Sequence, residues 1–184
     1  MKMKKIIFTA LFAALTCVAT MIIKLPTPTM GYIHPGDAVV LLSGLLLGPV
    51  YGGLAAGIGS MFADLFSGYL AYAPATFIIK CFTAVIAYCI AKQLKKIFSD
   101  LPTVILAGIV GESFMVVGYF VFEIFMLALS TSSKLTAASL TSGIVASASG
   151  IPFNIVQGIF GVIIATILYP ILKRILKQTE GGIQ

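Results

Sequence analysis

Polar side chains that could bind a small molecule lie within long apolar runs of the sequence. Lys80 lies inside one such run, and Asn154 and Gln157 lie three residues apart in the last one, which places both amides on one face of a helix. A charged residue within a membrane-spanning helix costs a few kcal/mol on insertion scales and is usually functional or paired. Together with a carboxylate, this lysine and the two amides suit a small hydroxylated heteroaromatic ring, and they would suit other small molecules too.

Further polar residues gather near the same ends of the apolar runs. Glu112 and Glu123 are eleven residues apart, about three helical turns, so they lie on nearly one face. The other candidates lie at or between the ends of the runs: His34, Asp37, Asp64, Tyr69 and Tyr72. Nearly all of these groups fall on the outer side in the topology predicted below. We therefore expect an outward-facing pocket for a small polar molecule.

Each of these residues also has a purely structural interpretation. Lys80 could form an ion pair with Glu123 or Asp64, and Asp37 could cap the helix that follows it. His34 could be an ordinary loop residue, Asp64 could extend to the membrane interface, and the tyrosines could belong to the interfacial aromatic belt. The sequence leaves these alternatives open.

Motifs for enzymatic chemistry are absent from the sequence. It contains no HExxH metal site, no GxSxG nucleophile elbow and no GxxxxGK[ST] phosphate loop. A single histidine gives little basis for a catalytic triad or a metal centre, and the three cysteines form no CxxC pair. We therefore expect a protein that is not an enzyme, with no cofactor, no metal and no ATPase site of its own.

The elements that carry these residues are predicted to be membrane helices. Of the 184 residues, 59% are hydrophobic and 10% are charged, whereas about 25% of residues are charged in a soluble domain. The mean hydropathy is +1.09. About 20 apolar residues cross a bilayer as a helix, so the chain has material for about five or six spans. The net charge of +6 comes from basic clusters beside apolar runs, which indicates orientation signals rather than nucleic-acid binding.

A break at Gly48-Pro49 decides the number of spans, because proline removes a backbone donor and disfavours a continuous helix. With this break, the basic residues fall on the cytoplasmic side, except Lys24 and Lys134 outside and Lys80 within a span. We predict an all-α integral membrane protein, a six-helix bundle forming one domain over residues 1–184, with an uncleaved first span and both termini cytoplasmic. The predicted spans are about 5–24, 36–48, 50–67, 74–92, 102–129 and 150–173.

Two of the predicted external connections are longer than turns. Segment 25–35 contains three prolines and a glycine, so we expect a stiff, non-helical loop that could cover a pocket. Segment 130–150 is rich in Ser, Thr and Ala and is either a mobile loop or an extension of the fifth helix.

Small residues at a spacing of four let membrane helices approach closely, since apolarity alone does not drive helices together in lipid. Gly52, Ala56 and Ser60 recur in this way in the third span, and Ala10 and Ala14 do so in the first. Such stripes serve either internal packing or the docking of another membrane protein. A pocket without any visible source of energy for transport favours partners that supply it.

Three stretches of the sequence together resemble a known family. HPGDAVVLLSGLLLGPVYGG (34–53), GIGSMFAD (57–64) and GYLAYAPATFIIK (68–80) are similar to the substrate-binding S component of energy-coupling factor (ECF) vitamin transporters. Chain size and six spans extend the resemblance to most of the chain. It implies high-affinity capture of a vitamin outside a bacterial plasma membrane. It also implies that the S component docks on a membrane coupling subunit served by two ATPase subunits. The S component then topples in the bilayer and releases the vitamin inside.

The resemblance also implies roles for individual residues. The family's docking signature, AxxxA on the first helix, is matched by Ala10 and Ala14. The family's pocket is formed by the first external loop and the outer parts of the fourth to sixth helices. The chain has no tryptophan, so tyrosines or phenylalanines would replace the stacking tryptophan of the thiamine-binding branch. The predicted substrate-binding residues are Lys80, Asn154, Gln157, Glu123, Tyr72, Tyr32, His34 and Asp37.

The sequence leaves alternatives open for both the substrate and the function class. The resemblance over residues 34–80 favours pyridoxine or a hydroxymethylpyrimidine-like compound, with pantothenate or cobalamin as alternatives. A self-sufficient secondary carrier or a membrane-assembly scaffold is the alternative function. A carrier alone in liposomes would move its substrate without ATPase partners, which an S component would not do.

Overall fold

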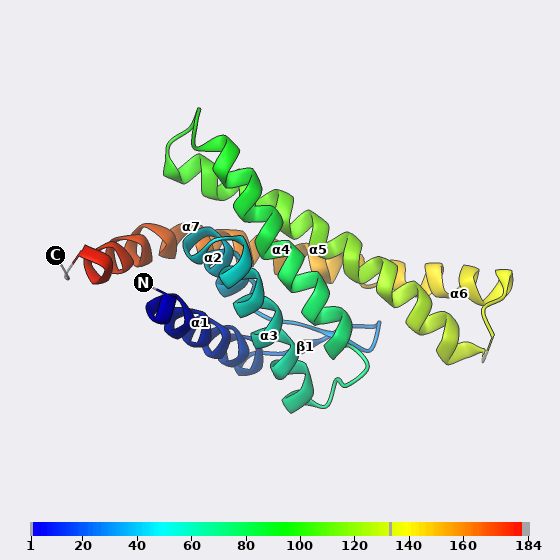
Figure 1. Ribbon diagram of the computed structural model, residues 1–184. Helices are drawn as coiled ribbons and strands as arrows, with labels where there is room; N and C mark the ends of the chain where they lie inside the picture. Colours follow the sequence, from blue (N-terminus) through cyan, green and yellow to red (C-terminus); the bar gives the residue numbers. More distant parts are fainter. Residues whose placement is uncertain (1, 133, 182–184) are drawn as a thin grey trace.

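The computed structural model describes residues 2–132 and 134–181, and it is almost entirely helical. Within this part of the chain, four helices are long and apolar enough to cross a membrane: α1 (Lys2–Ile22), α4 (Ala73–Leu94), α5 (Asp100–Thr131) and α7 (Ile151–Gly181). The remaining helices are α2 (Asp37–Leu47), α3 (Pro49–Ser67) and α6 (Ala137–Ala148). The start of α1 and the end of α7 lie at the same end of the bundle (Figure 1).

Segment 25–35 is non-helical, as predicted, and it contains a small antiparallel pair of strands. Strand β1 (Leu25–Pro26) pairs with β2 (Tyr32–Ile33), and the backbone N–H of Thr27 donates to the carbonyl of Gly31 at 2.9 Å. This pair connects α1 to α2 at the end of the bundle away from the start of α1 (Figure 1). We call this end the hairpin end.

The predicted break at Gly48-Pro49 is present, and it separates α2 from α3. Gly48 has φ 86° and ψ 179°, a conformation that a residue with a Cβ rarely adopts. Pro49 is the first residue of α3, where its missing N–H removes no helical hydrogen bond. The local chemistry of these two residues therefore converts one long apolar run into two antiparallel helices.

Segment 130–150 differs from both expectations, because most of it forms the separate helix α6. Thr136 and Ser139 make a capping box: the Thr136 hydroxyl accepts from the Ser139 N–H at 3.1 Å, and the Ser139 hydroxyl accepts from the Thr136 N–H at 2.9 Å. Gly143 lies so close to α5 that a Cβ there would come within 2.4 Å of the Ile124 carbonyl oxygen. The cap and the close contact with α5 thus define α6 as a helix of its own. It is neither a mobile loop nor an extension of α5.

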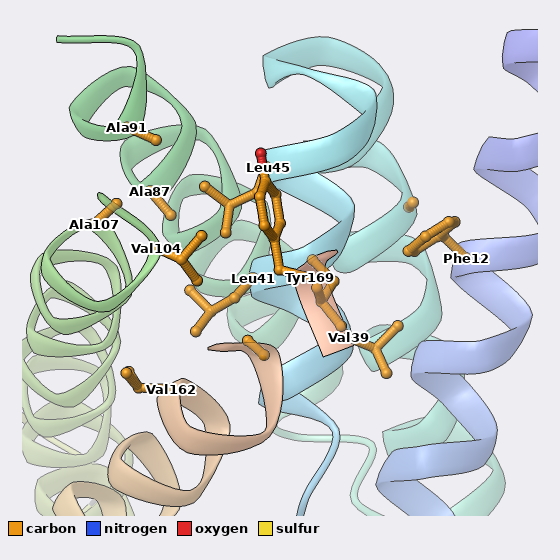
Figure 2. Close-up of a cluster of buried hydrophobic side chains, with 13 residues drawn as sticks. Phe12, Val39, Leu41, Leu45, Ala87, Ala91, Val104, Ala107, Val162 and Tyr169 are labelled. Carbon is orange, nitrogen blue, oxygen red and sulfur yellow. The ribbon is translucent and has the colours of Figure 1, made fainter. Parts of the chain in front are cut away.

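Helix α2 lies at the centre of the bundle, and almost all of its residues are buried. Side chains from α1, α4, α5 and α7 meet those of α2 in the main hydrophobic cluster (Figure 2). The cluster includes Phe12, Val39, Leu41, Leu45, Ala87, Ala91, Val104, Ala107, Val162 and Tyr169. A short helix can occupy this position because other helices, rather than lipid, surround it.

Glycines in α2 and α3 allow the helices to touch through their backbones. A Cβ at Gly44 would lie 2.3 Å from the Ala84 carbonyl oxygen in α4, and one at Gly59 would lie 2.3 Å from that of Ala13 in α1. The small residues of α3 therefore serve internal packing. Ala10 and Ala14 are different, because both are exposed on α1.

Candidate ligand-binding site

A narrow cavity lies at the hairpin end, where segment 25–35 meets α3, α4, α5 and α7. Its interior leaves room for about one water molecule. A vitamin-sized ligand would therefore enter only after segment 25–35 or the lining side chains move. The lining residues are Thr27, Gly31, Tyr32, His34, Asp64, Tyr72, Thr76, Tyr119, Glu123, Asn154 and Gln157.

Aromatic rings form part of the cavity wall. The rings of Tyr72 and Tyr119, both in the lining, have centroids 6.4 Å apart, and the lining ring of Tyr32 is supported from outside the lining by Tyr69, with centroids 4.5 Å apart. Tyr72 comes directly before α4, while Tyr119 projects from α5 and donates its hydroxyl to Thr76 at 3.1 Å. Such rings offer flat apolar surface together with hydroxyl groups, which suits an aromatic ligand with polar edges.

Glu123 and Asp64 place two buried carboxylates at the cavity. Glu123 Oε1 accepts from the Thr29 hydroxyl at 2.8 Å and from the Tyr72 hydroxyl at 3.2 Å, and Asp64 Oδ1 accepts from the Tyr32 hydroxyl at 2.7 Å. Among the residues that the structure describes, Glu123 Oε2 has no hydrogen-bond partner, and the Asp64 carboxylate has the Thr76 hydroxyl beside it as well as that of Tyr32. Each carboxylate thus binds segment 25–35 through one of its oxygens.

The tyrosine hydroxyls that bind these carboxylates remain protonated at neutral pH. Burial raises the pKa of Tyr32 above its ordinary value, and the nearby charge of Asp64 raises it further. Burial and the charge of Glu123 do the same for the pKa of Tyr72. The Tyr32 hydroxyl therefore holds segment 25–35 against Asp64. The Tyr72 hydroxyl has its shorter hydrogen bond, 2.6 Å, to the Thr29 carbonyl oxygen, and this bond joins the start of α4 to segment 25–35.

Lys80 and Asp37 form an ion pair outside the cavity lining. Both side chains are fully buried, and Lys80 Nζ lies 2.5 Å from Asp37 Oδ1. Asp37 Oδ2 accepts a second hydrogen bond, at 2.7 Å, from the side-chain amide of Gln157. The alternatives in which Lys80 pairs with Glu123 or Asp64 are wrong, because helix packing brings Asp37 closest to the ammonium group. Asp37 is also not the cap of α2, since Gly36 occupies that position.

Gln157 and His34 join segment 25–35 to α7. The backbone N–H of His34 donates to Gln157 Oε1 at 2.9 Å, and His34 Nδ1 accepts from the Gly36 N–H at 3.1 Å. Burial lowers the pKa of His34 to about 3, so its ring is neutral at physiological pH. His34 lies in a loop, and its backbone N–H and its ring both make hydrogen bonds that hold the chain where it enters α2.

The remaining predicted residues take different positions. Asn154 lies in the first turn of α7 and lines the cavity, so six of the eight predicted substrate-binding residues are in the lining and Lys80 and Asp37 are not. Glu112 is buried outside the lining, and neither of its oxygens has a hydrogen-bond partner among the residues that the structure describes. Ala10 and Ala14 lie on α1, apart from the cavity.

Tyr119 and Thr76 belong to the lining but were not among the predicted substrate-binding residues. Tyr119 lies four residues before Glu123 and therefore on the same face of α5. Thr76 lies four residues before Lys80 on α4, with the same consequence. Extending the helix-face argument from the charged residues to their neighbours would have found both.

Comparisons with known proteins agree on the kind of protein that this chain resembles. A model of the family described as ECF-type riboflavin transporter, S component, matches residues 1–174. A solved structure described as the S component of a bacterial ECF transporter has a similar fold, with a TM-score of 0.66 and 24% sequence identity. The similarity covers 96% of this chain and 99% of that one. At this identity the structural likeness supports the fold.

A sequence relative has also been described, from Pyrococcus woesei. This relative is described as an uncharacterized protein in the gap 3′ region. It is 35% identical to this chain over 103 residues, which is 55% of this chain. The match spans 66% of that relative, slightly less than two thirds of its length.

Proposed function

Because the chain belongs to the family of S components of ECF-type riboflavin transporters, we propose that it captures riboflavin in the cavity at the hairpin end and delivers it to an ATP-driven membrane partner. The family is a vitamin-uptake family whose members are substrate-binding subunits of transporters. The sequence favoured pyridoxine or a hydroxymethylpyrimidine-like compound, whereas the family model names riboflavin. Riboflavin therefore replaces them as the first candidate.

The observation that carries the proposal is the combination of tyrosine rings and hydrogen-bonding groups in one cavity. Tyr32, Tyr72 and Tyr119 supply aromatic surface for the flat ring system of a flavin. Glu123, Asp64 and Asn154 supply acceptors, and Asn154 also supplies donors, for the polar edge of the ring and the hydroxylated side chain. A concave site that places aromatic rings beside fixed polar groups is typical of small-molecule binding.

The proposed arrangement in the membrane has six crossings in one domain over residues 1–184, with both termini in the cytoplasm of a bacterial cell. Helices α1, α4, α5 and α7 would each cross once, and α2 and α3 would cross as a shorter antiparallel pair. Helix α2 is only 11 residues long, about 16 Å at 1.5 Å per residue, but protein surrounds it. This arrangement places the cavity on the outer side of the plasma membrane, where a vitamin would arrive.

The proposed delivery step uses the exposed face of α1. Ala10 and Ala14 lie there among the exposed apolar side chains of Ile7, Leu11 and Leu15. Small side chains let a partner helix approach closely. We assign this face to a membrane coupling subunit served by two ATPase subunits, with toppling of the bundle as the releasing motion.

The first experiment measures the thermal stability of the purified chain in detergent against a panel of vitamins. A ligand at about a thousand times its dissociation constant adds roughly 4 kcal/mol to the free energy of unfolding. We expect riboflavin to raise the melting temperature, and pyridoxine, hydroxymethylpyrimidine, pantothenate and cobalamin to have no effect. A shift with one of the other compounds and none with riboflavin would overturn the proposed substrate. Uptake by the chain alone in liposomes would instead identify a carrier.

A further inference from the structure

We propose that the end of the bundle away from the hairpin end binds the headgroup of an anionic phospholipid through Lys95 and Lys173, whose ammonium groups gather around one buried tyrosine. This inference goes beyond vitamin binding and depends only on the insertion of the helices in a membrane. It assigns a lipid class to a surface that the proposed function does not use.

Tyr169 fixes the position of both ammonium groups. It is 2% exposed and belongs to the main hydrophobic cluster (Figure 2). Lys95 comes directly after α4, and its Nζ donates to the Tyr169 hydroxyl at 2.9 Å and lies 5.5 Å from the centroid of the ring. Lys173 follows Tyr169 by one turn of α7, and its Nζ lies 5.6 Å from the same centroid. One buried ring therefore brings together two cations from distant parts of the chain.

Positive charge exceeds negative charge around this tyrosine. Lys173 Nζ lies 2.5 Å from Asp100 Oδ2, and both side chains remain partly exposed. Lys95 donates to a neutral hydroxyl. Among the side chains that the structure describes, Asp100 is the only carboxylate in an ion pair at this end. Four more basic residues follow the same ends of α4 and α7: Lys92, Lys96, Arg174 and Lys177. Because like charges held together repel, an anion from outside the protein would stabilise this arrangement.

The start of α5 adds a further attraction for an anion. Asp100 is the first residue of α5, so the ammonium group that it binds lies beside this helix end. No side chain caps the end, and the partial positive charge of a helix N-terminus favours an anion. The end of α4, the start of α5 and the last third of α7 thus contribute to one basic site at the membrane boundary.

Apolar side chains beside these cations suit the acyl chains of the same molecule. Ile97 and Phe98 lie in the turn between α4 and α5, and Leu101 lies in the first turn of α5. All three are exposed, as is Ile171 on α7. A free phosphate would not contact this apolar surface, whereas a phospholipid has both a charged head and apolar chains. Basic sites between membrane helices are known to bind acidic lipid headgroups, so the combination favours a lipid.

The test measures lipid binding to the purified full chain in detergent by native mass spectrometry. The probes are phosphatidylglycerol and phosphatidylcholine with identical acyl chains, so only the headgroups differ. We expect phosphatidylglycerol to bind at least about ten-fold more tightly, because each lysine near an anionic headgroup contributes about five-fold in affinity.

Variants of opposite effect separate this site from a general influence of positive charge. Lys95→Gln and Lys173→Gln should each weaken phosphatidylglycerol binding about five-fold and leave phosphatidylcholine binding unchanged. Lys134→Gln, beyond the other end of α5, removes the same charge and should change neither. Asp100→Asn frees Lys173 from its partner and should strengthen phosphatidylglycerol binding several-fold. A purely structural ion pair would not produce this increase.

Three results would overturn the proposal. Equal affinities of the unmodified chain for the two lipids would do so without any variant. An equal loss of phosphatidylglycerol binding in all three lysine variants would show an effect of overall charge rather than a site. Displacement of the lipid by glycerol phosphate at equal affinity would identify a free anion as the ligand. None of these measurements uses a vitamin, so riboflavin titration tests the proposed function separately.

Discussion

The side-chain oxygen of Gln157 accepts a hydrogen bond from the backbone N–H of His34 at 2.9 Å, and this bond ties α7 to the segment that borders the cavity. The amide nitrogen of the same side chain donates to Asp37 at 2.7 Å. One glutamine thus connects segment 25–35, the first residue of α2 and the buried ion pair. Movement of segment 25–35 during ligand entry would either break these hydrogen bonds or move Gln157 together with the segment.

Replacing Gln157 by leucine should destabilise the protein and loosen segment 25–35. The change leaves the His34 N–H and one Asp37 oxygen without their partners, which we expect to lower the free energy of unfolding by about 2 kcal/mol. Thermal unfolding in detergent measures this effect. Gln93→Leu, at an exposed position on α4, is the control. Equal melting temperatures for the two variants would show that the Gln157 bonds contribute little.

The Lys80 and Asp37 side chains should act as a unit. Lys80→Met or Asp37→Asn alone leaves a buried charge without its partner, so each should cost about 3 to 5 kcal/mol of stability. The double variant removes both charges and should be less destabilised than the sum of the two. A double-mutant cycle from unfolding measurements gives this coupling energy directly. Additive effects would contradict a buried pair.

Gly150→Ala should weaken vitamin binding. The new methyl group would lie 2.8 Å from Thr29 Cγ2 and 3.0 Å from Glu123 Oε2, so segment 25–35 or the carboxylate must shift. If the cost of overpacking, about 1 to 3 kcal/mol, falls on the bound state, affinity decreases about five-fold to 150-fold. Riboflavin titration measures the change, and Ser149→Ala, at the exposed neighbouring position, should bind normally. Normal affinity of Gly150→Ala would mean that this contact can relax freely.

Ala10→Trp and Ala14→Trp should separate binding from uptake. Both residues are exposed on α1 and outside the cavity lining, so riboflavin affinity should not change. A bulky side chain at either position should prevent the close approach of a partner helix and stop uptake in vesicles that also contain the coupling and ATPase subunits. Val121→Trp, on the exposed face of α5, controls for a bulky residue in lipid. Normal uptake by both alanine variants would refute the assigned docking face.

His34 should make stability depend on pH. Burial lowers its pKa to about 3 from an ordinary value of 6.5, so the unfolded chain binds more protons between these values. The free energy of unfolding should therefore fall as pH decreases below about 6.5. His34→Asn keeps an acceptor for the Gly36 N–H and cannot titrate there, so its melting temperature should fall less between about pH 7.5 and about pH 5.5. Identical pH profiles would assign the loss of stability to other groups.

Local chemistry made several features predictable from the sequence. The apolar composition identifies a membrane protein, because charged residues are too costly in a bilayer to be scattered through it. Gly48 and Pro49 mark the break between α2 and α3, since their backbone restrictions act at the residues themselves. Polar residues within and between the apolar runs, together with the resemblance to the ECF family, identified six residues that line the cavity: Tyr32, His34, Tyr72, Glu123, Asn154 and Gln157.

Only the tertiary structure decided which polar groups meet. Lys80 pairs with Asp37 rather than Glu123 or Asp64, and Gln157 reaches His34 across 123 positions of the chain. Such pairings depend on how far each helix slides and rotates against its neighbours. Backbone contacts such as that of Gly44 with Ala84 set these positions, and no spacing within a single helix encodes them. The sequence therefore determined which side chains need partners, and helix packing determined the partners.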